Sequence, residues 1–148
     1  MDNAPILKIK KMEGAVLPQY ESPAAAAMDI RAFVKEDIVI PPMGRVRLPT
    51  GLFFEIPPGY EVQIRSRSGL AFNHGVSVLN SPGTIDSDYR GEIGIILVNL
   101  GSEPYTVKNS DRIAQMLISP IVRPKIIESD SLSDTERGLG GFGSTGVE

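Results

Sequence analysis

The chain has 148 residues, no cysteine, and 18 acidic against 15 basic side chains, which gives a net charge of −3. This length predicts one domain with a core of its own, and the missing cysteine excludes disulfides and thiolate metal sites. The negative charge argues against general nucleic-acid binding. Because the sequence shows neither a signal peptide nor a membrane-length apolar run, we expect a cytoplasmic protein that does not bind a membrane.

Short segments of alternating apolar and polar residues dominate the chain, and 15 glycines and 12 prolines mark the turns. In residues 60–66, for example, Tyr60, Val62 and Ile64 alternate with polar neighbours. Regularly spaced short strands of this kind predict an all-β sandwich or barrel. The strands that we expect are residues 6–10, 45–48, 60–66, 92–100 and 112–118.

One short helix is expected at residues 68–75, "SGLAFNHG". Ser68 is suited to cap its start, and Gly75 is suited to end it. Three consecutive apolar residues are expected to pack the helix onto the sheets: Leu70, Ala71 and Phe72.

Two isolated polar residues carry little information by themselves. Asp29 is the one carboxylate in the small-residue stretch 24–32, where a turn or a strand end is the simpler interpretation. His74 is the only histidine, so no second imidazole is available for a metal site. We expect His74 at the surface or at a helix end.

The segment 64–71, "IRSRSGLA", leads from a predicted strand into the predicted helix. A helix start offers free backbone N–H groups and a partial positive charge, both of which favour an anion. Arg67 could contact two phosphate oxygens at once. The alternative is an edge strand whose arginines are only solvated.

The segment 80–94, "NSPGTIDSDYRGEIG", contains two carboxylates, Asp86 and Asp88, that share a face if the backbone is extended. One of them could act as a general base, while asparagine, glycine and exposed backbone could read the edge of a nucleobase. The alternative is a hairpin whose aspartates only stabilise its turn.

The segment 109–116, "NSDRIAQM", places Asp111, Arg112 and Gln115 close together. Asp111 and Arg112 could form a structural ion pair, or they could contact a ligand, and the sequence leaves both open. Further along, residues 128–136 are acidic and follow two prolines, which predicts an exposed linker. Extended at ~3.3 Å per residue, the twelve residues that lead from Lys125 to Arg137 could reach on the order of 40 Å.

The chain closes with the glycine-rich tail "RGLGGFGSTG", residues 137–146. The tail has P-loop spacing, but Ser144 replaces the lysine and no helix can follow, so a Walker A motif is rejected. Glycine N–H groups, Arg137 and two hydroxyls could still bind an anion, and Phe142 could stack on a planar group. The alternative is a disordered tail.

Taken together, "RSGLA", "GTIDSDYRGE", "DRIAQM" and "RGLGGFGSTG" resemble, in order and spacing, the motifs of the trimeric dUTPases, and the resemblance spans residues 24–146. It implies a jelly-roll-like β-barrel (residues 1–127), a flexible linker and arm (128–148), and a homotrimer with shared active sites that the arms close. It also implies hydrolysis of dUTP, with Mg²⁺ on the triphosphate, to dUMP and pyrophosphate. That reaction lowers dUTP and supplies dUMP for thymidylate synthesis.

The resemblance further implies a role for each matching residue. Asp86 would activate the attacking water, and Asp29 would contact the metal through water only. Tyr89 would pack under the deoxyribose, and Phe142 would cover the uracil. The other residues implied to bind substrate are Asn80, Gly83, Thr84 and Ile85 at the uracil, Arg67, Ser68, Gly69 and Gln115 at the phosphates, and Arg137, Ser144 and Thr145 at the γ-phosphate.

The sequence departs from the family pattern at Ala27, Ile30 and Ser66, where glycine, leucine and proline are common. Other functions fit less well. A dCTP deaminase shares the fold but would need an acid beside the uracil segment, and the glycine-rich tail favours the triphosphatase. A nucleotide-binding module would be expected to lack Asp86, and a structural jelly-roll protein would not need the tail.

Overall fold

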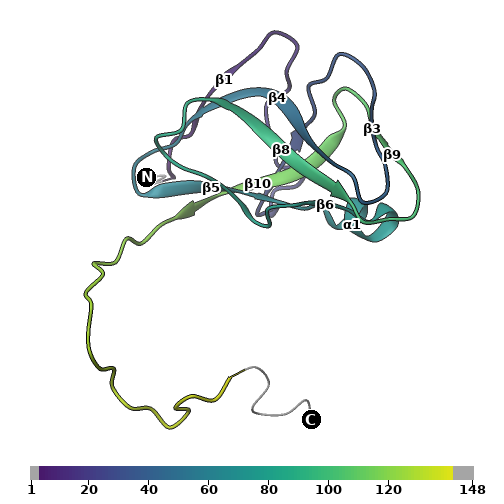
Figure 1. The fold of residues 1–148 in the computed structure, drawn as a ribbon. Coiled ribbons are helices and arrows are strands. Elements are labelled where there is room, and N and C mark those ends of the chain that lie inside the picture. Colours follow the sequence, from purple (N-terminus) through teal and green to yellow (C-terminus); the bar gives the residue numbers. More distant parts are fainter. Residues whose placement is uncertain (1–3, 142–148) are drawn as a thin grey trace.

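The structure, a computed structural model, describes residues 4–141 of the chain. The described part consists of strands and loops with one short helix (Figure 1). In chain order its elements are β1 (Lys8–Lys11), β2 (Met28–Arg31), β3 (Ile38–Ile40), β4 (Arg45–Glu55), β5 (Tyr60–Arg65), α1 (Ser68–His74), β6 (Val76–Val78), β7 (Gly83–Ile85), β8 (Glu92–Asn99), β9 (Tyr105–Val107) and β10 (Arg112–Pro120).

These strands form two four-stranded antiparallel sheets and one two-stranded pair. The first sheet has the order β1-β4-β8-β6, the second has the order β2-β10-β5-β7, and β3 pairs with β9. This arrangement confirms the expected all-β, jelly-roll-like fold. The five expected strands are also confirmed, although β4 continues to Glu55 rather than ending at residue 48.

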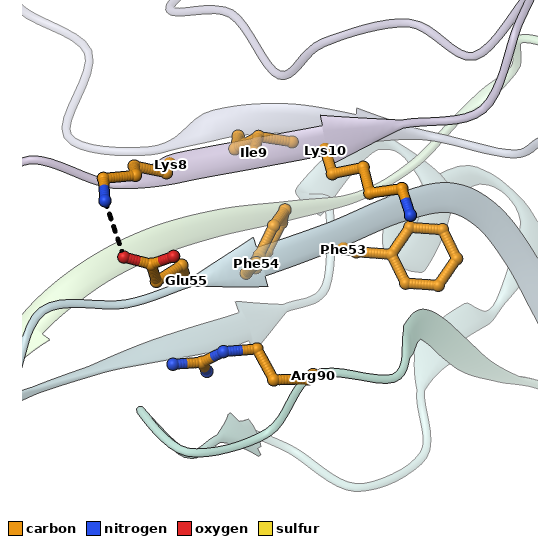
Figure 2. Close-up of a pocket in the computed structure, with 7 residues that line it drawn as sticks. All are labelled: Lys8, Ile9, Lys10, Phe53, Phe54, Glu55 and Arg90. Carbon is orange, nitrogen blue, oxygen red and sulfur yellow. Dashed lines mark hydrogen bonds and ion pairs between the residues drawn. The ribbon is translucent and has the colours of Figure 1, made fainter.

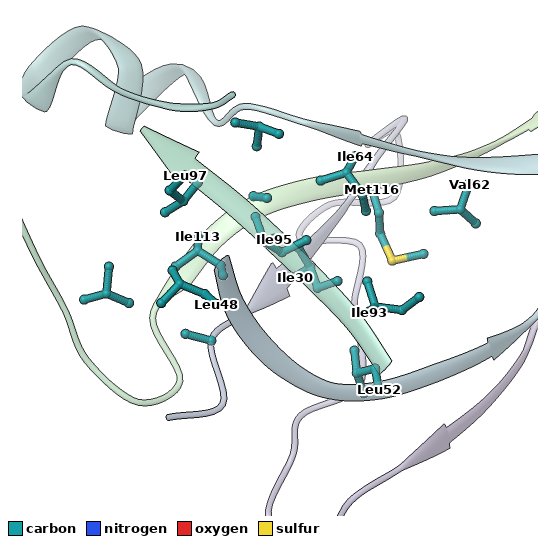
Figure 3. Close-up of a cluster of buried hydrophobic side chains, with 14 of the residues drawn as sticks. Ile30, Leu48, Leu52, Val62, Ile64, Ile93, Ile95, Leu97, Ile113 and Met116 are labelled. Carbon is teal, nitrogen blue, oxygen red and sulfur yellow. The ribbon is translucent and has the colours of Figure 1, made fainter. Parts of the chain in front are cut away.

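The core lies between the two large sheets (Figure 3). Ile93, Ile95 and Leu97 project from β8 toward Ile64 of β5 and Met116 of β10, and each of the five side chains is at most 2% exposed. Burying one such side chain contributes about 1.5–3 kcal/mol relative to leaving it in water. This packing therefore fixes the second sheet, which carries the candidate site residues Asp29, Gly83, Thr84, Ile85 and Gln115, against the first.

The helix is confirmed at Ser68–His74, but two details of the prediction are wrong. Arg67, not Ser68, occupies the capping position, and it makes no side-chain capping bond. Phe72 is 91% exposed, because it lies two residues from the buried Leu70 and so on the other side of a helix that packs on one face. Among the described residues, no helix is long and apolar enough to cross a membrane.

Gly75 ends α1 in the left-handed conformation, with φ of 67°, as the sequence predicts. A Cβ at this position would meet the backbone N of Gly101 at 2.5 Å. We expect Gly75→Ala to lower the free energy of unfolding by roughly 1–3 kcal/mol, because alanine tolerates neither this φ nor this contact. Denaturant unfolding measures the loss.

Gly69→Ala is the matched control for this prediction, since Gly69 lies within the helix and a Cβ there would meet nothing within 4 Å. Alanine is favoured over glycine in a helix by roughly 0.5–1 kcal/mol, so this variant should be no less stable than wild type. Equal stability of the two variants would contradict the proposed role of Gly75.

After β10 the chain leaves the barrel and runs away from it (Figure 1). The backbone N–H of Ile121 still bonds to the carbonyl of Gly59 at 2.9 Å, and residues 122–139 are exposed. The acidic stretch 128–136 is therefore an exposed connection in this structure, as expected. His74, exposed at the end of α1 with its ring centroid 5.0 Å from that of Tyr105, also lies where the sequence predicts.

Candidate active site

The second sheet brings four of the sequence motifs into one row. Asp29 of β2 lies opposite Gln115 of β10, and Gln115 lies opposite Arg65 of β5. The neighbouring β5 residue, Ile64, lies opposite Gly83 of β7. Since adjacent strands are about 4.8 Å apart, the row spans about 14 Å. Residues separated by up to 86 positions in the sequence thus lie within the length of a nucleotide.

One end of the row is a cluster of two arginines around a carboxylate. The Nε of Arg67 donates to Oδ1 of Asp29 at 3.0 Å, and Nη1 of Arg112 donates to Oδ2 at 3.1 Å. The Nη1 of Arg67 also donates to the backbone carbonyl of Arg112 at 3.1 Å. Asp29 therefore lies near the start of β2, and it is also the centre of an ion-pair cluster.

The open question of an Asp111–Arg112 pair is settled by these contacts. Arg112 pairs with Asp29, and more distantly with Glu21 at 3.7 Å. Asp111 instead accepts a hydrogen bond from the backbone N–H of Lys108 at 2.8 Å and so stabilises the turn before β10. The sequence pattern could not show this, because the partner of Arg112 lies 83 residues away.

The start of α1 lies next to this cluster. Ser68 and Gly69 are exposed in the first turn of the helix, where backbone N–H groups have no partner within the helix. Gln115 is held in place because its Nε2 donates to the carbonyl of Ser66 at 2.8 Å. Ser66, which the sequence marked only as a departure from the family pattern, also accepts the backbone N–H of Val78 through Oγ at 2.9 Å.

The other end of the row consists of β7 and the turn that follows it. Gly83 is buried, and a Cβ there would lie 3.1 Å from Nδ2 of Asn80 and 3.3 Å from Cβ of Ile64. A side chain at this position would therefore push Asn80 or Ile64 aside by a few tenths of an ångström. Thr84 is exposed and Ile85 is half-buried.

The sequence alternative of a hairpin over residues 80–94 is wrong. β7 pairs with β5 and β8 pairs with β4 and β6, so the chain crosses from one sheet to the other between these strands. The crossing begins with a turn in which the backbone N–H of Tyr89 bonds to the carbonyl of Asp86 at 3.2 Å. Asp86 and Asp88 are both exposed, but on a turn rather than on the shared face of an extended segment.

Asp86 lines a pocket of about 180 Å³. The other lining residues are Arg47, Thr84, Ile85, Tyr89, Glu92 and Gly94. The Tyr89 ring is 44% exposed, and its hydroxyl donates to the carbonyl of Glu92 at 3.2 Å. The ring lies so close to Gly91 that any Cβ there would collide with the phenol oxygen. A side chain at Gly91 would therefore displace the Tyr89 ring from this position.

Two residues of this pocket, Arg47 and Glu92, were not singled out from the sequence. The Nη2 of Arg47 donates to the carbonyl of Glu92 at 3.2 Å, and Oε1 of Glu92 accepts the backbone N–H of Gly51 at 2.9 Å. Arg47 comes from β4, which pairs with β8, and only that pairing brings it near Asp86. The one sequence signal was its polar position within the alternating segment 45–48.

Within the described residues, Arg137 does not join this row. Arg137 is exposed on the arm, where its Nε donates to the carbonyl of Gly140 at 2.8 Å. Phe142, Ser144 and Thr145 lie outside the described residues, so their predicted roles stay predictions.

A separate pocket of about 380 Å³ lies between β1 and β4, lined by Lys8, Ile9, Lys10, Phe53, Phe54, Glu55 and Arg90 (Figure 2). It contains none of the predicted site residues. Its one carboxylate, Glu55, is paired with Lys8 Nζ at 2.8 Å, and this hydrogen bond and charge lower the pKa of Glu55. The carboxylate of this pocket is thus paired with Lys8 in the structure.

Comparison with known proteins decides the family. The family model for dUTPase matches residues 13–146 of this chain. The chain belongs to the dUTPase family. Its relatives include the deoxyuridine 5'-triphosphate nucleotidohydrolases of Caldanaerobacter subterraneus subsp. tengcongensis, 58% identical over 96% of this chain and 98% of the relative, and of Treponema denticola, 51% identical over 93% and 96%.

Solved dUTPase structures share the fold. The dUTPase of Staphylococcus bacteriophage 80alpha in complex with dUpNHpp is 28% identical, covers 96% of this chain and 99% of its own, and has a TM-score of 0.83. A dUTPase variant of phage phi11 of Staphylococcus aureus, in which the coordination of a structural Mg(II) ion is described, is 24% identical. It covers 85% of this chain and 97% of its own, with a TM-score of 0.76.

Proposed function

We propose that this dUTPase family member hydrolyses dUTP to dUMP and pyrophosphate, with Asp86 activating the attacking water. The observation that carries the proposal is the position of Asp86: an exposed carboxylate at the end of β7, in a pocket shared with Thr84, Ile85 and Tyr89. A positioned carboxylate base contributes about 10²–10⁴-fold to such a reaction. The names of the relatives, and the dUTP analogue dUpNHpp in the phage enzyme, support dUTP as the substrate.

The nucleoside would lie along β7 and its turn. Asn80, which contacts Gly83, and the backbone of Thr84 and Ile85 would hydrogen-bond the uracil. Tyr89 would lie under the deoxyribose, where its ring leaves no room for a 2′-hydroxyl. Discrimination against UTP and dTTP follows from shape and from hydrogen bonds that a wrong nucleotide leaves unmade.

The triphosphate would lie at the helix start and the arginine cluster. Arg67, the backbone N–H groups of Ser68 and Gly69, and Gln115 would hold its oxygens. Attack at a phosphorus atom needs positioning and charge stabilisation more than covalent chemistry, and these donors would contribute to both.

The metal is expected to enter with the triphosphate as its Mg²⁺ complex. Asp29 fits a contact through water, because each carboxylate oxygen already accepts one guanidinium N–H and keeps a lone pair for a water molecule. Within the described residues, no group of three or more His, Asp or Glu side chains could hold the ion directly. The bound Mg²⁺ would supply charge neutralisation at the phosphate oxygens.

The remaining parts of the site would come from other chains. We propose that residues 1–127 form the barrel, that three barrels form a homotrimer with shared sites, and that residues 128–148 form the arm. Arg137, Phe142, Ser144 and Thr145 of that arm would close a neighbouring site over the γ-phosphate and the uracil. The exposed connection 122–139, which leads away from the barrel, supports an arm of this kind.

Pyrophosphate release from dUTP, dTTP, UTP and dCTP, measured side by side, tests the proposal. We expect dUTP to be hydrolysed in preference to the other three. Equal hydrolysis of dUTP and UTP would contradict the sugar-binding role of Tyr89, and release of ammonia from dCTP would instead indicate a deaminase.

Tyr89→Ala is expected to reduce the preference for dUTP over UTP by roughly 10-fold or more, because the ring that excludes the 2′-hydroxyl is gone. The ratio of the two kcat/KM values measures this. Tyr89→Phe is the matched control: it loses only the hydroxyl bond to Glu92 and should keep the preference. If the phenylalanine variant lost it as well, the hydroxyl rather than the ring would be the discriminating group.

A further inference from the structure

We propose that Arg112 is a second phosphate-binding guanidinium beside Arg67, and that Asp29 is a positioning residue for both. The inference rests on the proposed hydrolysis of dUTP, since it adds a ligand-binding residue to that site. The roles implied by the family motifs include neither function.

A β-bulge in β10 turns Arg112 toward the site. Between Arg112 and Ala114, β10 advances two residues while its partner β2 advances one, so Ile113 is an extra residue. In a regular strand, Arg112 and Gln115 would point to opposite faces. Here the consecutive residues Ile113 and Ala114 are both buried, so Arg112 comes to the face of Gln115. Bulges re-aim side chains in this way beside active sites.

Asp29 then fixes the two guanidiniums side by side. Each of its oxygens accepts from a different arginine, at 3.0 Å from Arg67 and 3.1 Å from Arg112. The Asp29 side chain is 13% exposed, against 26% for Arg67 and 41% for Arg112. The Asp29 carboxylate thus lies beneath the two guanidiniums, and the guanidiniums face the solvent.

Both guanidiniums retain unused donors. A guanidinium carries five N–H groups, and Arg67 uses two of them, one at Nε toward Asp29 and one at Nη1 toward a backbone carbonyl. Arg112 uses one, at Nη1. No other hydrogen bond of these two groups occurs in residues 4–141. Their outward N–H groups are therefore available to phosphate oxygens.

The local excess of positive charge also favours binding of an anion. Arg65 adds a third arginine to this side of the sheet, because it lies opposite Gln115. Among the described residues its guanidinium bonds only to the neutral side-chain oxygen of Gln63. Two carboxylates oppose them, Asp29 and the more distant Glu21. This surplus of positive charge occurs on a chain whose net charge is −3. A triphosphate, with about four negative charges, matches it.

Binding of dUpNHpp to Arg112→Gln, measured by calorimetry, tests the proposal. We expect affinity to fall roughly 10- to 100-fold, the value of a charge-assisted phosphate contact, while inhibition by deoxyuridine, which lacks phosphates, stays within about twofold. Arg112→Lys should lose less, because it keeps the charge but not the planar fork. Arg45→Gln, the same charge change on the first sheet, should bind as wild type does.

A double-mutant cycle tests the positioning role. If Asp29 acts through the arginines, the combined Asp29→Asn and Arg112→Gln variant should bind dUpNHpp more tightly than the product of the two single losses predicts. Multiplicative losses would contradict the positioning role. If Arg112→Gln, with an unchanged unfolding midpoint, bound dUpNHpp within twofold of wild type, Arg112 would not be a phosphate ligand; an equal loss for deoxyuridine would show a structural role instead.

Inorganic tripolyphosphate separates this inference from the proposed function. A wild-type chain that failed to hydrolyse dUTP would overturn the proposed function. The arginine pair is tested independently, because wild type should bind tripolyphosphate and Arg112→Gln should bind it at least roughly 10-fold more weakly. Equal binding by both proteins would overturn the role of Arg112.

Discussion

Asp86→Asn is expected to lower the turnover of dUTP by at least ~100-fold, while dUTP still binds. Asparagine keeps the shape and the polar surface of aspartate but cannot accept the proton of the attacking water. Asp86 is exposed and follows the end of β7, so the substitution should leave the barrel folded. Single-turnover kinetics, together with binding of dUpNHpp, separates the loss of chemistry from a loss of affinity.

Asp88→Asn is the matched control, because Asp88 is an equally exposed carboxylate on the same turn. It does not line the pocket that contains Asp86 and Tyr89. We expect its turnover to stay close to that of wild type. Near-normal turnover of Asp86→Asn would show that Asp86 is not the base. A large loss of turnover in Asp88→Asn alone would assign the role of the base to Asp88.

Truncation of the chain after Glu136 is expected to leave the fold and the trimer intact but to remove most activity, by roughly 10-fold at least. Residues 137–139, the first that the truncation removes, are exposed, so their loss opens no cavity in the core. The truncated chain lacks Arg137 and the tail that we propose closes over the triphosphate, which would leave the reacting phosphates open to water. Circular dichroism, sedimentation and kcat/KM measure the three parts of this prediction.

The full-length Arg137→Gln variant shows how much of the activity lost on truncation is due to the charge of Arg137. This variant keeps the tail but loses one guanidinium, and it should fall between wild type and the truncated chain. A truncated protein with wild-type kcat/KM would show that the arm takes no part in the reaction.

The strands could be predicted from the sequence because each follows from local alternation. Val62 and Ile64, two positions apart in β5, are both fully buried as a period of two requires. Phe72 was misplaced because an apolar residue in a short helix does not by itself indicate which face is covered. The crossing between sheets after Ile85 was missed since turn residues indicate a reversal of the chain but not the strand that it joins.

The site could be predicted in part only, and the limit is the pairing of distant strands. Asp86 and Arg67 lie in motifs of distinctive composition, whereas the partners of Asp29 depend on where β2, β10 and α1 meet. The bulge at Ile113 depends on how β10 pairs with β2. Nothing in "DRIAQM" shows that one residue of β10 has no partner in β2. Arg47 reaches the Asp86 pocket for the same reason, through the pairing of β4 with β8.

The position of β10 has a consequence for biosynthesis. Among the strands in residues 4–141 it is the last to be synthesised, yet it lies between β2 and β5 in the finished sheet. Until it emerges, Asp29 and Arg65 have no strand between them, and the nascent chain exposes the unpaired edges of both β2 and β5. Long-range pairing of this kind is slow and prone to association with other chains. We therefore expect a nascent chain to bind nucleotide only after β10 has joined the sheet.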